Sequence, residues 1–91
     1  MIEALSEAGQ QIGLDAATAA RLALVTGAGA GRLALESSDN ATPGQLRQRV
    51  TSPGGTTAAA INALQEGQFH DLMQQAVNAA KQRAAELASQ N

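Results

Sequence analysis

The sequence predicts an all-α protein of about five helices. Apolar residues recur at helical spacing along most of the chain, helix-capping residues precede these segments, and no alternating β-type pattern occurs. Hydrophobic residues make up 44% of the 91 residues, with no Trp, no Tyr and one Phe. Much of this apolar content is Ala, and because the gain on burial scales with area, it contributes little per residue. We therefore expect the fold to be stabilised by association.

The first half of the chain predicts two helices. Apolar residues recur at helical spacing over residues 2–12, and Gly13 is typical of the position that follows a helix. Asp15 is a favourable N-cap for a second helix over residues 16–37, which is rich in Ala, Leu and Gly. The run Ser37-Ser38-Asp39-Asn40 then predicts a turn.

The second half begins with a short predicted helix. Thr42 and Gln45 have the spacing of a capping box, and Pro43 occupies the first helical position, so this helix should run to about Val50. The segment Ser52-Pro53-Gly54-Gly55 breaks it.

Two more helices complete the prediction. One begins at Thr56 or Thr57 and ends at Gly67, with Ala60, Ile61 and Leu64 directed inward. The last helix carries a single apolar stripe. Its members are Phe69, Leu72, Met73, Ala76, Val77, Ala80, Ala84 and Leu87.

The glycine-rich stretch VTGAGAGRLA, residues 25–34, invites a comparison with dinucleotide-binding loops. Such a loop needs a preceding strand, a following helix and an acidic residue about 20 positions on. Here the preceding residues continue an Ala-rich helix, and no Asp or Glu occurs between Asp39 and Glu66. We therefore predict no cofactor-binding residue in this chain. The small residues instead predict one helix face that admits a close helix crossing, formed by Ala20, Ala23, Gly27, Gly31 and Ala34.

Charge and composition exclude several classes of function. The net charge of −2, with 15% charged residues, gives no basic surface for nucleic acid or an anionic membrane. No apolar run reaches the length of a membrane span. The absence of cysteine excludes disulfides and thiol catalysis and is compatible with the cytoplasm, where we expect the protein to reside. The single His70 lacks companions at metal-ligand spacing, so no metal site is predicted.

The stretch VTSPGGTT, residues 50–57, is the candidate binding segment. It places two glycines and several hydroxyls directly before a helix, whose first N–H groups have no intrahelical partner and carry partial positive charge. Such a position suits a small carboxylate or phosphate. An ordinary N-cap after a Pro-Gly turn explains the same residues, and the pattern alone leaves both interpretations open.

Three segments together resemble one known family. LRQRVTSPGGTTAAAI, followed by AVNAAKQRAAEL in the last helix, is similar to the C-terminal domain of pyrroline-5-carboxylate reductase, and the upstream EAL…GQQIGLDAATA segment fits as well. The resemblance covers essentially all of residues 1–91, as a single helical dimerisation and substrate-binding domain. The N-terminal Rossmann domain of that family, which binds NADPH or NADH, is expected to be absent from this chain.

The resemblance implies a fold and an activity. The fold is an interleaved helical dimerisation domain of the 6-phosphogluconate dehydrogenase C-terminal-like type, in a homodimer that can assemble further. The activity is hydride transfer from NAD(P)H to 1-pyrroline-5-carboxylate, giving proline, which this chain alone is not expected to perform. The segment before the fourth helix is implied to contact the imino-acid substrate or proline, through Val50, Ser52, Gly54, Gly55, Thr56 and Thr57.

Thr57 is the candidate catalytic residue. Its hydroxyl can orient the substrate, or relay the proton that the ring nitrogen gains, although a Thr hydroxyl is a poor acid unless it is linked to water. The alternative interpretation of the whole chain is a helical dimerisation module that binds no ligand and has no activity.

Overall fold

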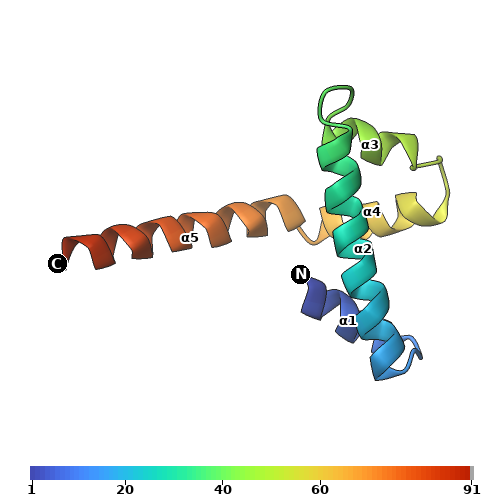
Figure 1. Ribbon diagram of the computed structural model, residues 1–91, viewed down its shortest axis with the longest axis horizontal. Coiled ribbons are helices and arrows are strands. Elements are labelled where there is room, and N and C mark those ends of the chain that lie inside the picture. The colour runs from blue at the N-terminus through green and yellow to red at the C-terminus, as the bar shows by residue number, and fades with distance from the viewer. Residues whose placement is uncertain (91) are drawn as a thin grey trace. The chain divides into compact units, whose positions relative to one another are not determined.

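The computed structural model describes residues 1–90 and confirms the all-α prediction. Its five helices, shown in Figure 1, lie within two residues of the predicted bounds, and the described residues contain no strand. The helices are α1 (Ile2–Gln11), α2 (Ala16–Glu36), α3 (Pro43–Arg49), α4 (Thr56–Glu66) and α5 (Phe69–Ser89). The contacts divide the chain into two compact units, Met1–Arg49 and the part from Val50 onward. That residues 1–91 form one domain in the assembled protein stays a prediction.

Helix α1 ends, and helix α2 begins, close to the residues that the sequence indicated. Gly13 follows α1 with φ +112°, a conformation that L side chains rarely adopt. Asp15 caps α2, because its Oδ1 accepts a hydrogen bond of 2.7 Å from the Thr18 N–H. Hydrogen bonds from the side chain and backbone of Thr18 to the carboxylate hold the pKa of Asp15 below its usual value.

The lowered pKa of Asp15 makes the stability of α2 depend on pH. A depressed folded-state pKa adds stability above the unfolded-state value, and this stability is lost as the pH falls through the folded-state pKa. We expect the melting temperature of the wild type to fall more than that of Asp15→Asn between about pH 5 and pH 3. Asn keeps an acceptor for Thr18 but does not titrate. Thermal unfolding followed by circular dichroism tests this, and parallel curves for the two proteins would contradict it.

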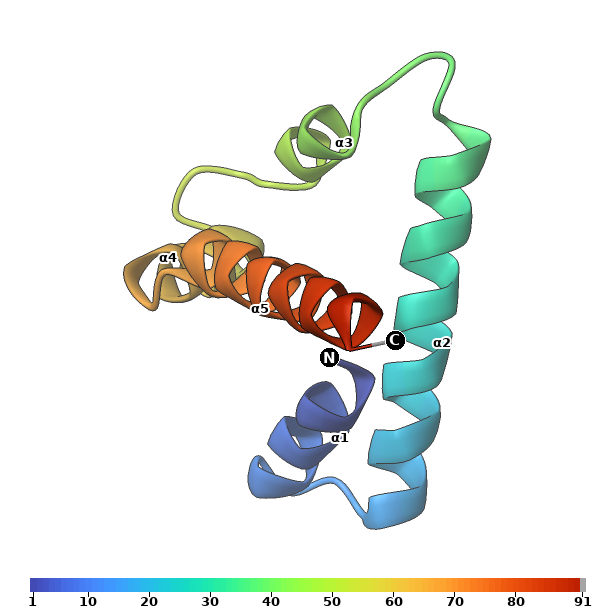
Figure 2. The ribbon, with the colours of Figure 1, turned by 90° about the vertical axis from the view of Figure 1, so that its left-hand side faces the viewer.

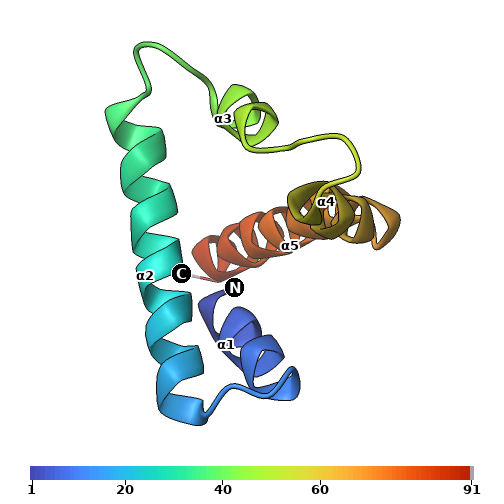
Figure 3. The same cartoon turned by 90° about the vertical axis from the view of Figure 1, so that its right-hand side faces the viewer.

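Helices α1 and α2 form an antiparallel hairpin, visible in Figures 2 and 3. Small residues permit the close approach. A Cβ added at Gly9 would lie 3.3 Å from the Ala19 Cβ, and one added at Gly27 would lie 3.3 Å from the Ile2 Cδ1. The start of α1 therefore lies beside the middle of α2, and the end of α1 beside the start of α2.

Helix α3 begins with the predicted capping box. The Thr42 N–H donates to Gln45 Oε1 at 2.9 Å, and the Gln45 N–H donates to Thr42 Oγ1 at 3.2 Å. The backbone N–H of each residue thus donates to the side-chain oxygen of the other. These two hydrogen bonds allow a helix as short as seven residues to have a defined first turn.

A short connection, Gly67 and Gln68, joins α4 to α5 in the second unit. Gly67 ends α4 with φ −80°, so it does not use the conformational freedom of glycine. The left-handed conformation falls instead on Gln68, with φ 59° and ψ 45°, which is the one non-glycine residue with positive φ among those described. The sequence did not predict this, because glycine is the usual residue in that conformation.

The conformation of Gln68 makes it a site for stabilisation. A left-handed residue with a Cβ costs about 1–2 kcal/mol, and glycine removes this cost while losing about 0.5–1 kcal/mol of its own through entropy. We expect Gln68→Gly to raise the free energy of unfolding by up to about 1 kcal/mol, measured by chemical denaturation. Gln68→Ala serves as the control and should give no gain. Equal stability of the two variants would show that the backbone at residue 68 is not strained.

Among residues 1–90, alanine alone is fully buried. The buried hydrophobic residues are Ala19, Ala23 and Ala41, all in the first unit, and none of the described residues of α4 or α5 is fully buried. Inward placement was predicted for Ala60, Ile61 and Leu64. Within one chain it is wrong for Ala60, which is exposed, and for Leu64, which is 50% exposed, while Ile61 is half-buried. Within this unit, α4 contacts α5, the other helix of the unit.

Candidate functional site

The segment before α4 forms a tight turn. Pro53 sets its first central position, and Gly54 takes φ +72° at the second. The Gly55 N–H then donates to the Ser52 carbonyl oxygen at 3.0 Å. Proline followed by a positive-φ glycine and closed by this hydrogen bond is the pattern of a type II turn. The sequence SPGG therefore fixes the direction from which the chain enters α4.

Gly55 is both the last residue of this turn and the N-cap of α4. Its backbone is extended, with φ −85° and ψ 177°, so its conformation alone does not require glycine. A Cβ added there would lie 3.1 Å from the Ser52 carbonyl oxygen, so a larger residue would press on the backbone of the turn. Gly55 also contributes no side-chain cap, which leaves the helix start open to an external acceptor.

A hydrogen bond within the turn reduces the number of backbone N–H groups that are available to a ligand. The sequence suggested that the N–H groups of Gly55, Thr56 and Thr57 could all face a carboxylate, but the Gly55 N–H is already engaged by Ser52. In the described part of the chain, no carbonyl accepts from the N–H of Thr56 or Thr57. Both of these residues are exposed, so their amides are the donors that remain.

The remaining predicted residues surround these amides in sequence and are open to solvent. Ser52 and Gly54 are exposed, and Val50 is 66% exposed. The segment from 50 to 57 contains no charged side chain, so its donors are backbone amides and hydroxyls only. Such a site can bind and orient an anion, whereas proton transfer from it would depend on a hydroxyl.

The glycine-rich stretch of residues 25–34 lies wholly inside α2, which confirms the helix predicted over it. Its predicted small-residue face is divided in the structure. Ala23 is buried and Gly27 contacts Ile2, so α1 already covers this part. Ala20 and Gly31 are exposed, no atom would meet a Cβ at Gly31 within 4 Å, and Ala34 is half-buried. The role of this face between two chains stays a prediction.

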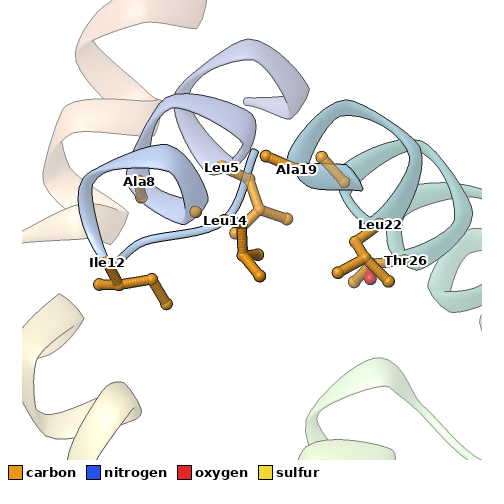
Figure 4. Close-up of a pocket in the computed structure, with 9 residues that line it drawn as sticks. Leu5, Ala8, Ile12, Leu14, Ala19, Leu22 and Thr26 are labelled. Carbon is orange, nitrogen blue, oxygen red and sulfur yellow. The ribbon is translucent and has the colours of Figure 1, made fainter. Parts of the chain in front are cut away.

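A feature that the sequence did not indicate is an apolar pocket of about 340 Å³ beside the α1–α2 hairpin (Figure 4). Leucines from α1, from the connecting turn and from α2 line it: Leu5, Leu14 and Leu22. Thr26 contributes the one polar side chain of its lining. The position of Leu14, in the turn and outside any helical period, is why the periodic pattern did not reveal this pocket.

The described residues also exclude other kinds of site. They contain no group of three or more His, Cys, Asp or Glu side chains that could hold a metal ion. None of the described helices combines the length and the apolarity needed to cross a bilayer.

The fold and the exposed side chains indicate the general class of protein. An alanine interior with many exposed large apolar residues is typical of an all-α association module, which completes its core with another chain. Comparison with known proteins identifies the family. A family model described as pyrroline-5-carboxylate reductase dimerisation matches residues 1–87, and the chain belongs to that family.

Similar proteins carry the name of the same enzyme. The chain is 50% identical over 90 residues to a pyrroline-5-carboxylate reductase of Pseudomonas aeruginosa, covering 99% of this chain and 32% of that protein. It is 42% identical to pyrroline-5-carboxylate reductase 2 of Bacillus subtilis and 44% identical to the pyrroline-5-carboxylate reductase of Pisum sativum. These matches cover 98% and 94% of this chain and 31% of each relative. The chain thus spans about a third of the length of these relatives.

Proposed function

We propose that this chain is the dimerisation and substrate-binding part of a pyrroline-5-carboxylate reductase. The whole enzyme transfers a hydride from NAD(P)H to the carbon of the C=N bond of 1-pyrroline-5-carboxylate, and the ring nitrogen gains a proton, giving proline. The observation that carries this proposal is the exposed start of α4 after a type II turn, in a chain whose family and relatives are named for this reductase.

The nicotinamide cofactor, NADPH or NADH, would bind mainly to a separate nucleotide-binding domain. The stretch of this chain that resembles a phosphate-binding loop is helical throughout, which supports this division. The chain alone would therefore be inactive, because the site for the hydride donor would lie in that other domain. Its contribution would be to hold the acceptor of the hydride.

The substrate carboxylate would bind at the N-terminus of α4. The N–H groups of Thr56 and Thr57 remain as donors there, and the partial positive charge of the helix start favours an anion. The Thr57 hydroxyl would orient the ring nitrogen by a hydrogen bond. Gly54 and Gly55 would let the ligand approach the backbone closely, with Val50 as an apolar neighbour and Ser52 as the anchor of the turn.

The functional unit would be a homodimer. The family is defined by dimerisation, and the apolar side chains of α5 support the same conclusion, since Leu72, Val77 and Leu87 are 57%, 63% and 47% exposed in the single chain. The second candidate function is a dimerisation module without ligand, which these exposed residues support equally well.

Amide hydrogen exchange with proline separates the two candidates. We expect saturating proline to slow exchange in peptides that cover Ser52–Ala58, by about tenfold when the free ligand is at ten times its dissociation constant, because only the occupied state protects these amides. Exchange in peptides that cover α5 should not change. Pyrrolidine, which has the ring without the carboxylate, is the matched control and should give no protection.

The outcome of this experiment is decisive for the site. If a folded dimer shows no effect of proline, the ligand-free module is the better description of the isolated chain. If pyrrolidine protects as well as proline, the carboxylate does not bind at the amides of α4.

A further inference from the structure

We draw no further inference here: the strongest candidate, the apolar pocket between α1 and α2 together with the exposed hydrophobic side chains of its unit, restates the association by which the dimerisation family is already defined, and nothing in the structure shows which segment covers it.

Discussion

Met73→Asp is expected to dissociate the assembled protein. Met73 lies in the apolar stripe of α5 and is 41% exposed in the single chain, and we expect a second copy to cover it. Burial of a Met side chain contributes about 1.5–3 kcal/mol, and a carboxylate in its place would be desolvated without a partner. In a symmetric dimer the loss occurs twice. The dissociation constant should therefore rise by at least about 100-fold.

Sedimentation velocity over a dilution series measures this effect. The matched control is Gln75→Asp, which introduces the same charge two residues away, on the opposite side of α5 from the stripe. This control should remain associated at the concentration where Met73→Asp is monomeric. If both variants associate like the wild type, the stripe of α5 is not part of the interface.

Thr57→Ala in the full-length reductase is expected to lower kcat/KM by about 10-fold to 100-fold. The substitution keeps the backbone N–H at the start of α4 and removes only the hydroxyl. Loss of a hydrogen bond that is made as the ring nitrogen gains its proton corresponds to about 1.4–2.7 kcal/mol of transition-state stabilisation. Steady-state kinetics with 1-pyrroline-5-carboxylate measures the change.

Two variants make this experiment specific to the hydroxyl of Thr57. Thr57→Ser restores a hydroxyl and should recover most of the activity, while Thr57→Val keeps the shape and should not. The dissociation constant for proline should change little in Thr57→Ala, since the amides proposed to bind the carboxylate remain. Wild-type kinetics for Thr57→Ala would show that this side chain does not act in the reaction.

Local chemistry allowed most of the fold to be predicted from the sequence. Asp15 and the pair Thr42 and Gln45 make the hydrogen bonds that their spacing indicated, because capping depends on residues only three apart. The SPGG segment forms the expected break for the same reason. The predicted helix bounds were therefore close at every one of the five helices.

Features that depend on neighbours or on exact backbone angles could not be predicted in this way. The sequence places Gly67 at the end of α4, but the left-handed conformation falls on Gln68, one residue later. The engagement of the Gly55 amide by Ser52 follows from the closure of the turn and not from the residue types alone. Leu64 and the large aliphatic residues of the α5 stripe are exposed in the single chain, and the periodic pattern carries no information about what would cover them.

The alanine interior has a consequence for the life of a newly synthesised chain. Until it meets a partner, each chain presents leucine, isoleucine and valine side chains to water, and such surfaces favour nonspecific aggregation. The time that a chain spends alone shortens as its concentration rises, because encounter is bimolecular. Aggregation also requires encounters between chains, so the fraction that becomes functional would depend on how fast specific association is relative to nonspecific association.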